Sequence, residues 1–240
     1  MKILIISGGR LNAESAPALF EKIGMGKLCT AAGRGKLDGI YVIAVDGGLA
    51  YCKDCGIFPD HLVGDFDTIT EDILQEYTKE PDIKVHRYQP QKDFTDTEAA
   101  VNLAIDLIQW EKEPDNLIYL LGGLGSRMDH TMANLGCLKK TIQAGIPMKI
   151  IDEQNCIYGF DDSFCLYRQQ LIYKEYLSLL ALEPVEGLTI RGMKYETDGL
   201  ALPVLDSRGV SNELEKEKAE VEFTSGVLLV METKDLIERT

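Results

Sequence analysis

Six short apolar runs divide the first 150 residues of the 240-residue chain, and they constrain its fold more than any other feature. The runs are rich in Ile, Val and Leu without strict alternation, which is typical of strands buried on both faces of a parallel sheet. Amphipathic stretches between them, clearest at Thr95–Trp110 and Asp129–Ala144, predict helices. This alternation indicates an α/β domain with a doubly wound, mostly parallel sheet. The predicted strands are Lys2–Ile6, Ile40–Val45, His61–Val63, Ile83–Tyr88, Leu117–Leu121 and Met148–Ile151.

The pattern changes after Asp152, where short β-prone pieces recur roughly every 8–12 residues. Turn-forming pairs such as Glu183-Pro184, Asp198-Gly199 and Ser225-Gly226 separate them. Such spacing predicts a small all-β sandwich. We therefore expect an α/β domain at residues 1–154 and a β-sandwich domain at residues 155–240. The predicted strands of the second domain are Phe164–Tyr167, Tyr176–Leu182, Leu188–Arg191, Gly199–Leu202, Ala219–Thr224 and Val227–Glu232.

The charge balance limits the partners, because 39 acidic residues face 25 Lys and Arg and the net charge is −14. A nucleic-acid backbone needs a basic face, so nucleic acid is excluded as a main partner. By charge alone, the same surplus opposes binding of ATP, which is also polyanionic. No apolar run reaches the roughly 18 residues that span a bilayer, and the N-terminal apolar stretch is shorter than that of a signal peptide. We expect a soluble cytoplasmic protein that does not bind membranes.

Polar segments follow four of the predicted strands. They are Asp46-Gly47-Gly48, Gly64-Asp65-Phe66-Asp67, Lys92–Glu98 and Gly122–His130. Each alone could be a turn, a helix cap or a simple connection. The carboxyl ends of parallel strands, however, lie along one edge of a sheet, where ligands bind. We therefore expect the four segments to form one site.

Six aspartates would share this edge, and their charges need compensation. Two like charges about 4 Å apart repel by roughly 4 kcal/mol at an effective dielectric of 20. Carboxylates without clustered Cys or His suit Mg²⁺, Mn²⁺ or Ca²⁺, while glycines let backbone approach a phosphate, and Lys92 and Arg127 supply positive charge. There is neither a GxxxxGK[ST] nor a GxGxxG signature. The aspartates are Asp46, Asp65, Asp67, Asp93, Asp96 and Asp129.

In order and spacing the four segments resemble the motif series of the thiamine pyrophosphokinase (thiamine diphosphokinase) family. Ser207–Glu213 resembles the thiamine-side motif of bacterial members. One departure is Thr68 after Asp67, where family members usually carry Ser. The resemblance implies transfer of pyrophosphate from ATP to the thiamine hydroxyl, giving thiamine diphosphate and AMP. It also implies ATP and Mg²⁺ in the first domain, thiamine at the second domain, and a homodimer.

The resemblance assigns roles to individual residues. One of the aspartates Asp67 and Asp96 could also accept the proton of the thiamine hydroxyl. The predicted catalytic residues are Asp65, Asp67, Asp93, Asp96 and Arg127, and the four aspartates among them are the predicted metal ligands. The predicted nucleotide-binding residues are Asp46, Gly47, Gly48, Lys92, Gly123, Arg127, Asp129 and His130. The predicted thiamine-binding residues are Ser211 and Asn212.

Three alternatives stay open from the sequence. A pyrophosphokinase for another alcohol, such as a hydroxymethylpterin, could use the same first domain, although Ser211-Asn212 favours thiamine. A metal-dependent phosphohydrolase could use Asp65 or Asp67 as a phosphoryl acceptor. A non-catalytic thiamine or nucleotide sensor would bind these ligands without turnover.

Overall fold

The chain forms two compact units, Met1–Glu153 and Gln154–Thr240. The structure, a computed structural model, describes residues 1–25, 35–37, 39–89, 91–111, 115–125 and 127–235. The domain boundary predicted from the sequence lies one residue beyond the division between the units. No helix among these residues is both long and apolar enough to cross a bilayer.

The first unit is built on six parallel strands in the order β4-β3-β2-β1-β5-β6. The strands β1, β2, β5 and β6 have the bounds that the apolar runs predict. β3 is one residue longer than predicted, and β4 is one residue shorter at each end. The strands are β1 (Lys2–Ile6), β2 (Ile40–Val45), β3 (His61–Gly64), β4 (Lys84–Arg87), β5 (Leu117–Leu121) and β6 (Met148–Ile151).

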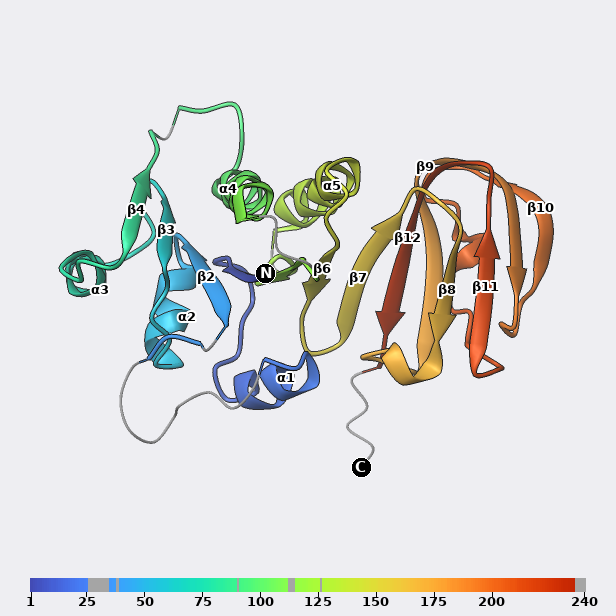
Figure 1. The fold of residues 1–240 in the computed structure, drawn as a ribbon, viewed down its shortest axis with the longest axis horizontal. Helices are drawn as coiled ribbons and strands as arrows, with labels where there is room; N and C mark the ends of the chain where they lie inside the picture. The colour runs from blue at the N-terminus through green and yellow to red at the C-terminus, as the bar shows by residue number, and fades with distance from the viewer. Residues whose placement is uncertain (26–34, 38, 90, 112–114, 126, 236–240) are drawn as a thin grey trace. The chain divides into compact units, whose positions relative to one another are not determined.

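Within the described residues, five helices connect these strands, and the direction in which successive strands are added to the sheet reverses once. From β1 the chain proceeds outward through α1, α2 and α3 to β4, and α4 then returns it across the sheet to β5, on the other side of β1. Figure 1 shows α4 and α5 on one side of the strands and α1 and α2 on the other. The loops after β1 and β5 therefore diverge, which opens a crevice at the carboxyl edge. The helices are α1 (Ala16–Lys22), α2 (Gly48–Asp54), α3 (Glu71–Thr78), α4 (Asp96–Glu111) and α5 (Met128–Gln143).

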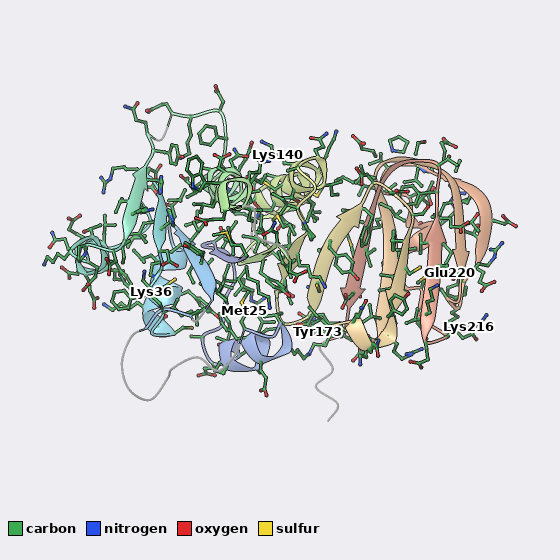
Figure 2. The ribbon with its side chains drawn as sticks, viewed as in Figure 1. Met25, Lys36, Lys140, Tyr173, Lys216 and Glu220 are labelled. Carbon is green, nitrogen blue, oxygen red and sulfur yellow. The ribbon has the colours of Figure 1, made fainter. Side chains whose placement is uncertain are left out.

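The core of this unit is the central strand and the helix packed on it. The four residues of β1 from Ile3 to Ile6 have no exposed surface, and each such side chain stabilises the fold by roughly 1.5–3 kcal/mol. Helix α4 turns mainly small side chains inward, among them Ala99, Ala100 and Ala104, and contacts β1, β2 and β3. Lys140 of α5, labelled in Figure 2, forms an ion pair with Glu98 of α4 at 2.5 Å. This ion pair links the two helices whose first turns border the crevice.

The second unit consists of antiparallel strands and two short 3-10 turns. β12 pairs with β7 and β9, β9 pairs also with β10 and β11, and β11 pairs with β8. β9 thus takes part in several ladders, but whether they form a sandwich stays a prediction. The strands are β7 (Asn155–Phe160), β8 (Phe164–Tyr167), β9 (Tyr176–Arg191), β10 (Thr197–Leu202), β11 (Lys218–Glu222) and β12 (Ser225–Thr233).

Three turns predicted from the sequence in this unit are wrong, because their residues lie inside strands. Ser225-Gly226 begins β12, and Phe223-Thr224 separates it from β11. β9 continues through Glu183-Pro184, because the partner strand β12 shifts register between Ser225 and Val227 and so needs no N–H from the proline. Asp198-Gly199 lies inside β10, where the pairing with β9 is also irregular. Bulges accommodate residues that usually end a strand.

Candidate functional site

A pocket of about 500 Å³ lies in the first unit, at the point where the chain direction reverses. Its wall comes from the loop after β1, the start of α2, the first turn of α4, the loop after β5 and the first turns of α5. This is where an open α/β sheet binds its ligands. The lining residues are 7–9, 45–47, 50, 68, 95–97, 122–125, 127, 130, 131 and 134.

Three aspartates gather at the ends of the neighbouring strands β2 and β3. Asp46, Asp65 and Asp67 each offer a carboxylate oxygen, and these oxygens lie within 4.8 Å of one another. The local backbone is unusual, because Asp46 has φ +41° and Phe66 has φ +63°. The Phe66 N–H donates to Asp46 Oδ1 at 3.1 Å. A side chain at Gly64 would place its Cβ 2.1 Å from the same oxygen, so this arrangement requires glycine there.

Burial and the neighbouring carboxylates disfavour the charged form of Asp46 in this acidic group. Burial raises the pKa of Asp46 to about 6, and the charges of Asp96, Asp65 and Asp67 act in the same direction. The hydrogen bond from the Phe66 N–H opposes this shift only in part. Clustered carboxylate oxygens are the donor set that Mg²⁺ prefers. The acidic group therefore fits a hard divalent cation. Asp46 belongs to this group, although the sequence analysis predicted that it binds the nucleotide.

The predicted metal ligands Asp93 and Asp96 lie outside this group. Asp93 is exposed. Asp96 begins α4, lines the pocket and accepts from Lys92 Nζ at 2.7 Å in a largely buried ion pair. Lys92 Nζ also lies 5.7 Å from the centre of the Tyr88 ring. Asp96 and Lys92, the side chain predicted to bind phosphate, are therefore paired with each other.

Arg127, the other side chain predicted to bind phosphate, also forms an ion pair with an aspartate. Arg127 Nη2 and Nε donate to the two carboxylate oxygens of Asp129 at 2.6 and 3.1 Å, and both side chains are exposed. The guanidinium lowers the pKa of Asp129 to about 2. Arg127, His130, Gly47 and Gly123 line the pocket. The structure thus brings most predicted nucleotide residues to one place.

Gly48 lies behind the pocket wall, at the first position of α2, where its Cα faces the end of β1. A Cβ there would approach the Ile6 carbonyl oxygen to 2.0 Å, so no other residue fits without a backbone shift. The predicted residue Gly48 therefore supports the site through packing.

Several lining residues were not predicted from the sequence. Ser7 and Thr97 are buried and share a hydrogen bond of 2.8 Å that ties the end of β1 to the first turn of α4. Thr68 lines the pocket beside the acidic group. The segment Ser7–Gly9 directly follows the first predicted strand, a position that could have revealed it. Asn134 does not follow a predicted strand, so its position in the sequence did not mark it as a pocket residue.

Asn134 lies on α5, is 3% exposed and lines the pocket. Its Nδ2 donates to the Gly123 carbonyl at 2.7 Å. Its Oδ1 is buried and has no hydrogen-bond partner among the described residues. A buried acceptor in this state is uncommon in folded proteins.

The predicted thiamine residues lie in the second unit. Ser211 is exposed and has φ +58°, and its N–H donates to Ser178 Oγ at 3.0 Å. Asn212 is 4% exposed, and its Oδ1 accepts from the N–H groups of Tyr195 and Glu213 at 2.9 Å. Its Nδ2 donates to the Tyr195 carbonyl at 2.9 Å. The Asn212 amide thus holds two loops together and retains one N–H.

Two family models match the chain. Residues 38–150 match the catalytic domain of thiamin pyrophosphokinase, and residues 165–228 match its vitamin B1 binding domain. The chain is 32% identical over 195 residues to thiamine pyrophosphokinase of Bacillus subtilis, covering 80% of this chain and 87% of that protein. It is 27% identical over 205 residues to thiamin pyrophosphokinase 1 of Caenorhabditis elegans, covering 82% and 81%.

Solved structures resemble the fold over nearly its whole length. The crystal structure of thiamine pyrophosphokinase from Bacillus subtilis has a TM-score of 0.78 at 28% identity, covering 98% of this chain and 100% of the other. Thiamin pyrophosphokinase from Candida albicans has a TM-score of 0.74 at 17% identity, covering 97% and 90%. The second likeness supports the fold alone.

Proposed function

The chain belongs to the thiamine pyrophosphokinase family and is an enzyme of that activity, and we propose that the pocket of its first unit is where the reaction takes place. ATP donates a pyrophosphoryl group to the hydroxyethyl oxygen of thiamine, which yields thiamine diphosphate and AMP. The observation that carries this proposal is the acidic group Asp46, Asp65 and Asp67 beside a crevice large enough for a nucleotide.

The acidic group would hold Mg²⁺ together with phosphate oxygens of ATP. Asp65 and Asp67 are the first candidates as ligands, and the raised pKa of Asp46 supports its inclusion. A bound Mg²⁺ would neutralise phosphate charge that increases during transfer. The predicted ligands Asp93 and Asp96 would then act from outside the group, on water or on the substrate.

The protein's own residues contribute mainly by positioning the phosphates and neutralising their charge. Lys92 and Arg127 would exchange their carboxylate partners for phosphate oxygens, which frees Asp96 and Asp129. Gly47 and Gly123 would keep the backbone of the pocket wall close to the nucleotide, Gly48 supports that wall by packing on β1, and His130 lies at the wall.

The nucleophile is a hydroxyl of the substrate, so no nucleophilic side chain is required. Removing its proton would make that oxygen more reactive, and Asp67 or Asp96 would accept the proton. Asp96 becomes available for this role when Lys92 turns to phosphate. The buried hydrogen bond between Ser7 and Thr97 holds the first turn of α4, and with it Asp96, in place.

The second unit would bind thiamine as a β-sandwich, with Ser211 and the remaining N–H of Asn212 near the pyrimidine. The match of residues 165–228 to a vitamin B1 binding domain supports this part of the proposal. We also propose that the protein is a cytoplasmic homodimer, as the family resemblance implies.

The test is product analysis with ATP and Mg²⁺, with and without thiamine. The proposal predicts AMP and thiamine diphosphate in equal amounts, and only when thiamine is present. Formation of ADP and thiamine monophosphate would contradict the type of transfer. Phosphate release without thiamine would indicate a phosphohydrolase, turnover only with a hydroxymethylpterin would indicate another substrate, and binding without turnover would indicate a sensor.

A further inference from the structure

Among the described residues, the side-chain oxygen of Asn134 is the buried side-chain atom of the pocket that has no hydrogen-bond partner. Asn134 is 3% exposed, and its Oδ1 finds no partner among the described residues. Leaving a buried acceptor unpaired costs about 1–3 kcal/mol. A ligand that offers a donor would recover this cost on binding, so the atom indicates part of the ligand's chemistry.

The orientation of the amide follows from its one partner. The Gly123 carbonyl can only accept a hydrogen bond, so the nitrogen of Asn134 must face it at 2.7 Å and the oxygen points elsewhere. The amide nitrogen carries two hydrogens, of which Gly123 uses one. Asn134 therefore retains one acceptor and one donor in the wall of the pocket.

Phosphate oxygens do not complement an unpaired acceptor, because at neutral pH they too are acceptors. The phosphates would lie toward the acidic group and its cation, at residues from β2 and β3. Asn134 comes from α5 and contacts the loop after β5. The nucleoside half of ATP would therefore extend toward Asn134.

We propose that Asn134 is a specificity-determining residue that recognises the adenine base. Adenine presents its 6-amino group as a donor next to N7 as an acceptor, and this pair complements the oxygen and the remaining N–H of an Asn amide. A 6-oxopurine presents two acceptors on the same edge and is rejected. This inference rests on the proposed function, because it takes ATP as the ligand.

The experiment compares ATP with ITP, whose base carries an oxygen in place of the 6-amino group. The wild type is expected to use ATP at least about tenfold better than ITP in kcat/KM, since ITP leaves the acceptor unpaired. In Asn134→Leu the preference is expected to shrink to within about threefold, since the site that discriminates has been removed. A purely structural role would change the thermal stability and leave the ratio between the two nucleotides intact.

A second variant tests the acceptor oxygen separately from the hydrogen bond that the side chain donates to Gly123. Asn134→Asp keeps an acceptor oxygen but cannot donate to Gly123, so it should retain a preference for ATP. Thr141→Val is the matched control, because Thr141 is also buried on α5, donates to the Leu138 carbonyl at 2.9 Å and does not line the pocket. Its ratio of ATP to ITP use should equal that of the wild type.

Three results would overturn the assignment. One is an unchanged preference for ATP in Asn134→Leu, and another is a change confined to the KM for thiamine. The third is a preference for ATP over 2′-deoxy-ATP that disappears in the variant, because the ribose would then be the donor. Calorimetric binding of AMP and IMP provides the same comparison without turnover, so absence of pyrophosphokinase activity would refute the proposed function and leave this inference testable.

Discussion

Two buried asparagines, one in each unit, differ in what surrounds their amide groups. Asn134 and Asn212 are 3% and 4% exposed. The Asn212 oxygen accepts two N–H groups, whereas the Asn134 oxygen has no partner among the described residues. A buried amide whose oxygen has its acceptor sites used stabilises the fold, and one with an unused acceptor can accept a hydrogen bond from a ligand.

Two carboxylates, one buried and one half-buried, differ in the number of backbone N–H groups that they accept. Glu232 of β12 is fully buried and accepts from the N–H groups of Ile172 and Tyr173 at 2.6 and 2.9 Å; Tyr173 is labelled in Figure 2. Asp46 accepts one N–H, and burial and three neighbouring aspartates raise its pKa to about 6. Glu232 therefore ties the segment before β9 to β12, whereas Asp46 directs a carboxylate oxygen toward those of Asp65 and Asp67.

The largest expected effect is on catalysis at the acidic group. Asp65→Asn should lower kcat/KM by about 10²–10³-fold or more, as does the loss of a group that stabilises charge in the transition state. The midpoint of thermal unfolding should stay the same or rise, because repulsion among the carboxylates falls. Assays of AMP release and thermal unfolding measure both. Asp106→Asn, at an exposed position of α4, is the control. Near-normal activity in Asp65→Asn would remove Asp65 from the metal ligands.

The opposite behaviour is expected at Glu232. Glu232→Ala should lower the free energy of unfolding by about 3 kcal/mol, because the N–H groups of Ile172 and Tyr173 lose their acceptor and a cavity forms. Urea denaturation provides the measurement. Loss of activity without loss of stability in this variant would contradict a structural role.

The two asparagines test the comparison directly. Asn212→Ala should cost about 2 kcal/mol of unfolding free energy, because it leaves the N–H groups of Tyr195 and Glu213 without their acceptor. Asn134→Leu should cost less than about 1 kcal/mol, since it also removes an unpaired buried oxygen. Equal losses in parallel urea titrations would show that the contrast between the two units has no energetic basis.

The smallest effect is a pH dependence of stability. The pKa of Asp46 is raised, so the folded state binds more protons than the unfolded state between about pH 4 and pH 6, and the contribution of Asp46 to stability falls as pH rises. His61 has the opposite effect. Burial lowers its pKa to about 4, so its contribution to the stability of the fold is complete above pH 6.5 and is lost as the pH falls toward 4.

Comparison of the wild type with Asp46→Asn separates these opposing contributions. The variant should gain about 1 kcal/mol relative to the wild type between pH 4 and pH 7, after allowance for solvent screening of a half-exposed group. Denaturation curves across this range measure the difference. A constant difference across the range would mean that the pKa of Asp46 is not raised.

The sequence predicted the first unit well, because its strands are continuous apolar runs. β1, β2, β5 and β6 begin and end where those runs do. The second unit was harder, because register shifts opposite Pro184 and within β10 allow turn-forming residues inside strands. β7 was not predicted, since it lies at the junction of the two patterns.

The candidate site was only partly predictable for a related reason. Residues that follow a strand, such as Asp65 and Asp67, are marked by their position in the sequence. Which strand ends are neighbours depends on the order of strands in the sheet, and this order brings Asp46 to the acidic group. Asp93 lies outside the group although β4 neighbours β3, because it follows the end of β4 by six residues. Asn134 is visible only through the packing of α5 against the loop after β5.

The most direct test of the central claim is binding of Mn²⁺, as a substitute for Mg²⁺, measured by electron paramagnetic resonance with a non-hydrolysable ATP analogue. The account predicts that the wild type and Asp106→Asn bind Mn²⁺ in the presence of the analogue, and that Asp65→Asn and Asp67→Asn lose most of this binding. Equal Mn²⁺ binding by all four proteins would contradict the account, because the acidic group would then not be the metal site.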